Sequence, residues 1–330
     1  MSELHKFIFD GMPVRGMLVR LTDAWQEVLQ RRASNNQGGA YPQPVRELLG
    51  EMAAAGVLMQ SGIKFNGALI LQIFGDGPVK VAVAEIQSDL RLRATASIVG
   101  AVEPHDRLAD LVNRGNQGRC AITLDPKDKF PGQQPYQSMV PLFDDRGERL
   151  HKLSDALQHY MLQSEQLDTT LVLAADDRVA CGLLVQRMPV QGEGNLAGSF
   201  VSAENEAAIG RDEDYNRIAH LAASLQRDEL LTLDADTILR RLFWEEPLLR
   251  FAPQDADHAP RFACSCSRER VAGMIRGLGR EEADSILEEQ GRIEVGCDFC
   301  GRQYRFDPVD TTQIFAAPAQ VVVPGTSAVQ

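Results

Sequence analysis

The chain has 330 residues, of which 44% are hydrophobic, so it can bury the core of more than one domain. Its formal net charge of −12 argues against a general nucleic-acid binder, since phosphate contacts require clustered Lys and Arg. No apolar run approaches roughly eighteen residues, and the N-terminus lacks the features of a signal peptide. We therefore expect a cytoplasmic protein without a membrane span.

The first 190 residues are predicted to form a mixed α and β core. Alternation of apolar and polar residues predicts strands at 7–9, 14–21, 69–73, 79–83, 91–99, 120–124, 136–143, 170–173 and 179–185. Helical spacing of apolar residues predicts helices at 23–29, 45–59, 108–112 and 150–167. Short turns join several neighbouring strands, which favours antiparallel sheets. This region has no phosphate loop, nucleophile elbow or His/carboxylate cluster, so we predict no catalytic residue.

Two of the six cysteines fall within these predicted strands. Cys120 and Cys181 each share a strand face with two branched apolar residues. A free cysteine in such surroundings behaves as a small hydrophobic residue. We therefore expect both to be core residues and not reactive thiols.

A stretch rich in Gly and Ser at 191–202 marks a predicted boundary, and a charged helical segment follows at 203–258. This segment holds thirteen acidic residues against six arginines. Its apolar residues lie in stripes, one around Ile218 and Leu221 and another around Ile238 and Leu242. Such helices fold only by placing their stripes on another surface. Two interpretations stay open: an ordinary helical connector, and an element that docks only while its neighbours are folded.

The other four cysteines form two close pairs separated by thirty residues. The pairs are Cys264-Ser265-Cys266 and Cys297-Asp298-Phe299-Cys300. Two thiolates from each pair match the ligand set of a tetrahedral zinc ion. Glycines flank the second pair within a strand–turn–strand pattern at 293–306, and apolar stripes predict helices at 271–278 and 283–290. A domain this small needs a metal or disulfides, so all four cysteines are candidate metal ligands.

The C-x-C and C-x-x-C pairs at this separation are a specific combination, and other stretches accompany them. These are YMLQSEQL at 160–167, ITLDP at 122–126, LILQ at 69–72, GDGP at 75–78 and IEV at 293–295. Together they resemble the redox-regulated 33-kDa heat-shock chaperone family, often called HslO. The resemblance extends from about residue 5 to about residue 310. The chain beyond about residue 312 is an extension that the family pattern does not require.

With the patterns above, the resemblance implies an α+β protein with four segments. These are a chaperone core domain at 1–190, a metastable helical linker at 191–258, a zinc-binding redox-switch domain at 259–310 and a disordered tail at 311–330. The reduced protein is expected to be an inactive monomer that binds one Zn²⁺ per chain through Cys264, Cys266, Cys297 and Cys300.

The resemblance also implies how this protein would be activated. Oxidation would form the disulfides Cys264–Cys266 and Cys297–Cys300, release zinc, and unfold the redox-switch domain and linker. The resulting homodimer would act as an ATP-independent holdase that binds unfolding client proteins under oxidative stress. The family resemblance implies no enzyme activity, and we expect neither nucleic acid nor membrane as a partner.

Three other functions would use the same cysteines differently. A zinc-ribbon nucleic-acid binder would use the arginines around the pairs, although the net charge opposes it. A thiol–disulfide oxidoreductase would use Cys297 and Cys300, but that motif normally opens a helix after a strand. A metabolic enzyme with a structural zinc lacks the motifs of an active site. His258 is expected at the surface, because four cysteines already complete a tetrahedral site.

Overall fold

The structure is a computed structural model that describes residues 1–34, 39–130, 133–188, 212–252 and 258–316. It divides into two compact units. Met1–Gln30 and Tyr41–Phe262 form the first unit, and Arg31–Ala40 and Ala263–Gln330 form the second. The Gly- and Ser-rich boundary predicted at 191–202 lies outside the described residues.

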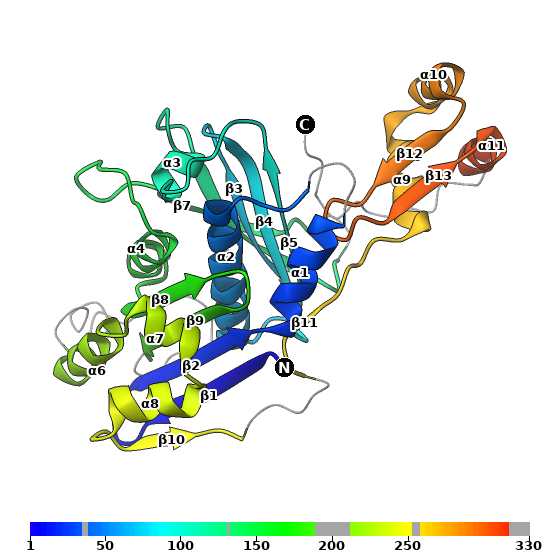
Figure 1. The fold of residues 1–330 in the computed structure, drawn as a ribbon. Coiled ribbons are helices and arrows are strands. Elements are labelled where there is room, and N and C mark those ends of the chain that lie inside the picture. The colour runs from blue at the N-terminus through cyan, green and yellow to red at the C-terminus, as the bar shows by residue number, and fades with distance from the viewer. Residues whose placement is uncertain (35–38, 131–132, 189–211, 253–257, 317–330) are drawn as a thin grey trace. The chain divides into compact units, whose positions relative to one another are not determined.

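A five-stranded antiparallel sheet, called sheet A below, lies in the first unit (Figure 1). Its strands in spatial order are β10 (Leu248–Arg250), β1 (Glu3–Phe9), β2 (Val14–Leu21), β9 (Ala180–Arg187) and β8 (Thr169–Ala175). A Cβ atom at Gly16 would lie 2.1 Å from the Phe7 ring, so only glycine leaves room for this ring on the neighbouring strand. Sheet A thus pairs the N-terminal hairpin with strands from two distant parts of the sequence.

A six-stranded sheet, called sheet B, forms the opposite layer of the first unit. Its order is β11 (Arg261–Phe262), β5 (Arg91–Ile98), β4 (Val79–Gln87), β3 (Gly67–Phe74), β6 (Arg119–Pro126) and β7 (Tyr136–Val140). All neighbours are antiparallel except β11, which runs parallel to β5. The strands predicted at 69–73, 79–83 and 91–99 are confirmed as β3, β4 and β5, which pair antiparallel.

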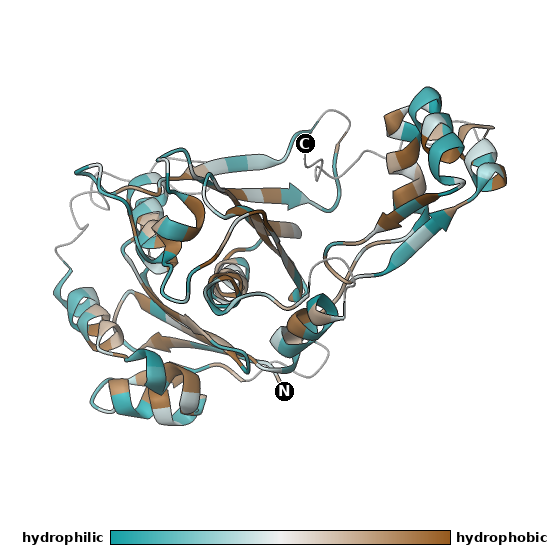
Figure 2. Ribbon diagram, turned by 45° about the horizontal axis from the view of Figure 1, so that its top comes forward, coloured by the Kyte–Doolittle hydropathy of each residue, from teal (hydrophilic) through white to brown (hydrophobic). Residues whose placement is uncertain are grey.

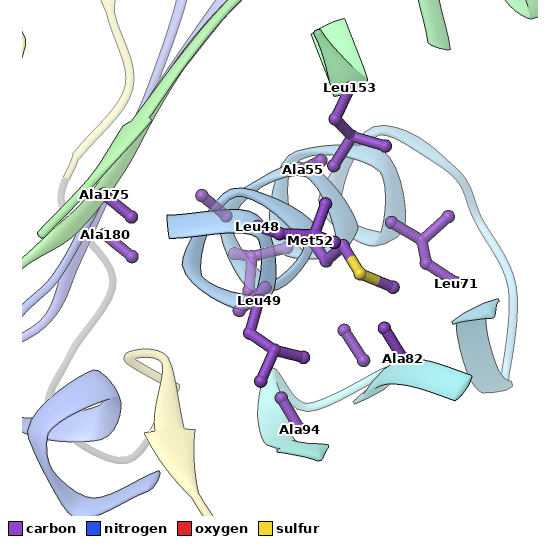
Figure 3. Close-up of a cluster of buried hydrophobic side chains, with 14 of the residues drawn as sticks. Leu48, Leu49, Met52, Ala55, Leu71, Ala82, Ala94, Leu153, Ala175 and Ala180 are labelled. Atoms are coloured by element: carbon purple, nitrogen blue, oxygen red, sulfur yellow. The ribbon is translucent and has the colours of Figure 1, made fainter. Parts of the chain in front are cut away.

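Helix α2 (Gln43–Gly62) fills the space between the two sheets, where Figure 2 shows it nearly end-on. Pro44 in its first turn favours the start of the helix. Figure 3 shows α2 side chains between Ala175 and Ala180 of sheet A and Leu71 of sheet B. A Cβ atom at Gly50 would lie 2.4 Å from the Ala175 Cβ, so the helix packs almost directly on sheet A. The predicted α+β class with antiparallel sheets is confirmed.

Six further helices lie wholly or mostly in the described part of the first unit. They are α1 (Asp23–Ala33), α3 (Leu108–Val112), α4 (Leu153–Glu165), α6 (Glu213–Ala223), α7 (Arg227–Thr232) and α8 (Ala235–Phe243). Asp212 and Asp234 accept hydrogen bonds from backbone N–H groups at the starts of α6 and α8, which satisfies donors without a helical partner. Helices α6–α8 cover the face of sheet A that points away from α2. Within the described chain, no helix has the length and apolar character needed to cross a bilayer.

The described C-terminal part of the second unit, residues 263–316, is called the cysteine module below. Its elements are α9 (Arg268–Leu278), α10 (Arg280–Gln290), β12 (Ile293–Gly296), β13 (Gln303–Phe306) and α11 (Pro308–Ala316). Seven buried side chains form its core: Val271, Ile275, Ala283, Ile293, Tyr304, Phe306 and Ile314. Both predicted helices and the strand–turn–strand pattern are confirmed.

Some elements differ in extent from the sequence predictions. The strand expected at 136–143 ends at Val140, and the helix expected at 150–167 spans Leu153–Glu165. Helix α11 includes residues 311–316, which the sequence placed in the tail. Thr311 and Ile314 are buried there, so packing inside the module orders this segment. Residues 317–330 lie outside the described chain.

Candidate metal centre

The structure brings the four predicted ligand cysteines into one cluster. Cys264 and Cys266 lie between β11 and α9, and Cys297 and Cys300 lie in the turn between β12 and β13. Their four Sγ atoms all lie within 4.8 Å of one another. Two contacts join different pairs: Cys264 to Cys297 at 3.6 Å, and Cys266 to Cys300 at 3.3 Å. Residues far apart in the sequence thus form one sulfur site.

These distances fit a tetrahedral metal ion with four sulfur ligands. Around a zinc ion with Zn–S bonds of about 2.3 Å, ideal tetrahedral sulfurs lie about 3.8 Å apart. The observed separations need only small adjustments to reach that value. Soft thiolate ligands select zinc, iron or copper(I) over magnesium or calcium. The cluster can therefore hold a thiophilic metal ion.

The second pair is held by a tight turn. The Cys297 N–H donates to the Arg302 carbonyl at 2.9 Å, and the Gly301 N–H donates to the Cys297 carbonyl at 2.8 Å. Gly301 has a φ of 71°, a left-handed conformation that glycine adopts without steric cost. Backbone N–H groups of Phe299 and Cys300 also point at the Cys297 sulfur. The turn thus presents two sulfurs, and backbone N–H groups donate hydrogen bonds to both.

The first pair runs directly into a helix. Ser267 starts α9 and accepts a hydrogen bond from the Arg270 N–H at 3.2 Å, which satisfies a donor of the first turn. The Arg270 guanidinium reaches back to the Ser265 Oγ at 2.8 Å. This contact fixes the residue between Cys264 and Cys266, so the C-x-C segment is anchored from the helix that follows it.

The electrostatics of the site favour a bound cation. Burial raises the pKa of the Cys300 thiol to about 11. The hydrogen bond with Cys264, and then burial, raise the pKa of Cys297. Thiolates this close repel one another, whereas a coordinated thiol is deprotonated outright. Metal binding at this site therefore displaces protons from sulfur.

The remaining cysteines are confirmed as core residues. Cys120 is 1% exposed and Cys181 is fully buried, and both belong to apolar clusters of the first unit. Burial raises the pKa of each thiol to about 12. His258 is exposed, as predicted. Neither buried thiol competes with the four clustered cysteines for a metal.

One contact to the cluster was missed by the sequence interpretation. The hydroxyl of Tyr304 in β13 donates a hydrogen bond to the Cys266 Sγ at 3.1 Å. The alternation in β13 carries the signal, because Tyr304 and Phe306 are buried while their neighbours are exposed. A buried tyrosine needs a partner for its hydroxyl, and the nearby cysteines offer one.

Arginines near the cluster are largely occupied by acidic side chains. The pairs are Arg292 with Glu294 at 2.6 Å, Arg305 with Glu294 at 3.0 Å, Arg268 with Asp310 at 2.7 Å and Arg280 with Asp284 at 3.4 Å. Arg268 also lies 4.3 Å from the centre of the Phe306 ring and donates to the Arg305 carbonyl at 2.8 Å. Arg268 thus joins α9 to β13 and α11, and Arg305 joins β13 to β12.

A second feature of interest is the apolar face of sheet A beneath α6–α8. Its buried side chains come from the sheet (Phe7, Phe9, Val14, Leu18, Ala174, Val179, Cys181, Leu183 and Val185) and from the helical segment (Tyr215, Ile218, Ala222, Leu225, Leu230, Ala235, Ile238, Leu239, Leu242 and Phe243). Three aromatic rings meet there, with Phe243 5.1 Å from Phe9 and 6.0 Å from Phe7. The predicted apolar stripes at 218–225 and 238–244 thus pack on the core sheet, except for Trp244, which is 72% exposed.

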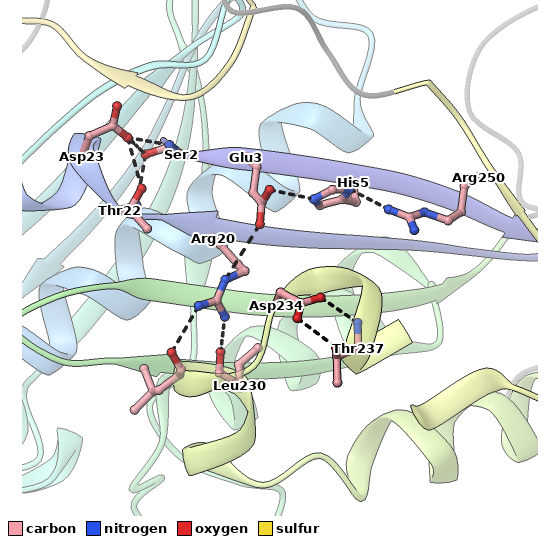
Figure 4. A network of polar contacts seen from close by, with 11 residues as sticks. Ser2, Glu3, His5, Arg20, Thr22, Asp23, Leu230, Asp234, Thr237 and Arg250 are labelled. Carbon is pink, nitrogen blue, oxygen red and sulfur yellow. Dashed lines mark hydrogen bonds and ion pairs between the residues drawn. The ribbon is translucent and has the colours of Figure 1, made fainter. Parts of the chain in front are cut away.

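Polar contacts fix these helices at a few points (Figure 4). Arg20 of β2 donates to the carbonyls of Leu230 and Leu231 at 2.6 and 3.2 Å, which satisfies acceptors at the end of α7. Arg227 donates to the Ala175 carbonyl and to Glu47 of α2, both at 2.8 Å. The helical segment is therefore docked by one apolar interface and a small number of directed bonds.

Comparisons with known proteins identify the family. A family model described as Hsp33 protein matches residues 2–307. The chain is 43% identical over 315 residues to the 33 kDa chaperonin of Chromobacterium violaceum, covering 95% of this chain and 94% of that protein. It is 41% identical over 325 residues to the 33 kDa chaperonin of Methylobacillus flagellatus, covering 98% and 97%.

A solved structure shows the same fold. The crystal structure of the 33 kDa chaperonin from Thermotoga maritima matches 94% of this chain and 97% of its own, with a TM-score of 0.68 and 20% sequence identity. The resemblance inferred from the cysteine pairs and the accompanying motifs is confirmed over nearly the whole chain. This protein belongs to the Hsp33 family.

Proposed function

We propose that this protein is a redox-regulated, ATP-independent holdase of the cytoplasm. In its reduced form it is a monomer with one Zn²⁺ bound by Cys264, Cys266, Cys297 and Cys300. Oxidation forms the disulfides Cys264–Cys266 and Cys297–Cys300, and the four sulfurs then no longer hold the metal. The zinc-binding domain at 259–310 and the linker at 191–258 unfold, while the core at 1–190 stays folded. The resulting homodimer binds unfolding clients and keeps them from aggregating.

The observation that carries this proposal is the position of the sulfur cluster inside a module with a very small core. The apolar core of the described module contains only seven buried side chains. A structural zinc site contributes on the order of 10–16 kcal/mol to folding, whereas whole domains are stable by about 5–15 kcal/mol. Loss of the metal therefore costs more free energy than the free energy of unfolding expected for such a module.

Hydrogen peroxide is the only oxidant needed to convert the four thiolates to two disulfides. A thiolate attacks hydrogen peroxide, an S–O bond forms, the O–O bond breaks, and hydroxide leaves with one oxygen. The second thiolate of the pair attacks the sulfur of the resulting sulfenic acid, the S–S bond forms, the S–O bond breaks and the second oxygen leaves as hydroxide. Each pair of thiolates thus gives two electrons to one molecule of peroxide and becomes one disulfide. Zinc keeps the thiols deprotonated, which maintains their nucleophilicity at neutral pH.

The docked helices connect this chemistry to client binding. Along the chain, the segment that carries α6–α8 is followed by β10, which pairs with β1, then by β11, which pairs with β5, and then by the cysteine module. Without a folded module, that segment depends on the two short strands β10 and β11 and on its own interface with sheet A. Undocking would expose an apolar face that contains Phe7, Phe9 and Leu18. A large exposed apolar face is a binding site for the hydrophobic segments of unfolding proteins.

Two observations favour this function over the alternatives. The C-x-x-C pair lies in a turn between β12 and β13, whereas an oxidoreductase would place it at a helix N-terminus. Four of the module's arginines pair with acidic side chains, which reduces the positive charge that a nucleic acid would meet. A gel shift at physiological salt and an insulin-reduction assay test these alternatives directly.

The proposal is tested by measuring zinc release and suppression of citrate synthase aggregation on the same sample, before and after peroxide under mild heat. We expect one zinc per chain to be released, suppression to appear only after oxidation, and thiol reductant to reverse it. Size-exclusion chromatography should show a monomer before oxidation and a dimer after it. A variant with Cys120→Ala and Cys181→Ala retains the cluster and should behave like the wild type. Retained zinc, or activity that is indifferent to redox state, would contradict the proposal.

A further inference from the structure

The Tyr304 hydroxyl contacts the cluster from outside the set of four cysteines. It donates to the Cys266 Sγ at 3.1 Å, and the residue is only 7% exposed. The guanidinium of Arg302 in turn hydrogen bonds to the tyrosine hydroxyl. A chain of hydrogen bonds therefore runs from a cation through Tyr304 to one of the four sulfurs. The core around Phe306 holds the tyrosine ring in place.

This contact differs in origin from the other hydrogen bonds to the cluster. The Cys297 sulfur accepts from the backbone N–H groups of Phe299 and Cys300, and the Cys300 sulfur accepts from the Arg302 N–H. Those donors follow from the path of the turn and persist with any side chain. The bond to Cys266 comes from a side chain, so a single substitution can remove it.

We propose that Tyr304 is a positioning residue that stabilises the Cys266 thiolate and lowers its nucleophilicity toward oxidants. This inference rests on the proposed zinc site. A hydrogen bond to an anionic acceptor is charge-assisted, and it withdraws electron density from the sulfur lone pairs that attack an oxidant. Hydrogen bonds to sulfur tune the potentials of iron–sulfur clusters in the same way. Partners of metal ligands also orient those ligands, and losing one costs about 10- to 100-fold in metal affinity.

Tyr304→Phe in the full-length protein removes the hydroxyl and keeps the ring. We expect the zinc dissociation constant, measured by chelator competition, to rise about tenfold. Alkylation of Cys266 in the zinc-bound protein, followed by mass spectrometry, should become about 3- to 10-fold faster because the charge-assisted hydrogen bond from Tyr304 is lost. In the cobalt(II)-substituted protein, the sulfur-to-metal charge-transfer band should shift, which reports directly on electron density at sulfur.

Thr311→Val is the matched control. It removes another buried hydroxyl of the same module, which donates to the Asp307 carbonyl at 3.0 Å and touches no sulfur. This variant should leave the alkylation rate of Cys266 and the cobalt band unchanged. Arg302→Met removes only the cation behind the tyrosine, and it should shift the cobalt band in the same direction as Tyr304→Phe by a smaller amount.

The outcomes separate this inference from the proposed function. If the wild-type protein binds zinc and Tyr304→Phe matches it in affinity, alkylation rate and cobalt spectrum, the role of Tyr304 is overturned and the proposed function stands. If both hydroxyl variants shift the measurements equally, the effect is one of module stability and the inference is again overturned. If the wild-type protein binds no zinc, the proposed function fails and the inference fails with it.

Discussion

Undocking α6–α8 without oxidation should activate the holdase, and Phe243→Ala is the sharpest way to do it. Phe243 is 3% exposed and packs on the rings of Phe9 and Phe7. Truncating a buried phenylalanine to alanine costs about 3–5 kcal/mol. A loss near 4 kcal/mol corresponds to roughly a thousandfold change in a docking equilibrium, since each 1.4 kcal/mol is about tenfold. Local undocking always requires less free energy than global unfolding, so α6–α8 should open first.

The assay is suppression of citrate synthase aggregation by reduced, zinc-loaded Phe243→Ala protein. We expect suppression without peroxide, at constant zinc content, together with faster hydrogen exchange in residues 213–250. Trp244→Ala is the matched control, because Trp244 is the next residue along the chain and is 72% exposed. It should stay inactive until oxidised. Rapid exchange in α6–α8 without suppression of aggregation would refute the claim that the face beneath these helices binds clients.

Three further predictions concern pH and the stability of the module. Burial raises the pKa of Glu51 from 4.5 to about 8. Between these two pH values folding takes up a proton, so the stability of the folded protein falls as the pH rises from 4.5 to about 8. Glu51→Gln should therefore raise the melting temperature more at about pH 9 than at about pH 5. Because protons compete with zinc for Cys300 and its partners, zinc affinity should weaken as the pH falls. Zinc binding should also release protons into a weakly buffered solution that contains a pH indicator. An unchanged indicator signal would count against thiolate ligation. Arg268→Ala should speed zinc loss to a chelator, because it removes contacts with Phe306, the Arg305 carbonyl and Asp310, and equal rates would show that these contacts contribute nothing.

Local patterns predicted the secondary structure well, because most elements of the core are long and strongly periodic. Helix α2 was found from one apolar stripe, but both of its faces are buried. Gly50 packs against Ala175 of sheet A, and Gly56 packs against Ile86 of sheet B. Small residues on the second face look neutral in sequence, so the placement of α2 between two sheets was not predicted. Strands β10 and β11 have only three and two residues, which is too short for any periodicity.

The candidate metal centre was more predictable than the sheets, because cysteine pairs carry their chemistry in their spacing. All four expected ligands lie in one cluster. What the spacing could not show is the surroundings of each sulfur, which depend on the register of β12 against β13. That register places Tyr304 opposite Val295 and brings its hydroxyl to Cys266. Helix α11 was missed because it is stabilised by the module, for example through the Arg276 Nε that donates to the Ile314 carbonyl at 2.9 Å.

The central claim is that oxidation unfolds one part of the chain and spares the rest. Hydrogen exchange followed by mass spectrometry, on the reduced zinc-bound protein and on the same protein after peroxide, tests it most directly. We predict that residues 268–316 and 213–250 lose protection after oxidation, while the strands of sheet B and helix α2 keep theirs. Unchanged protection in the cysteine module after both disulfides have formed would contradict this account.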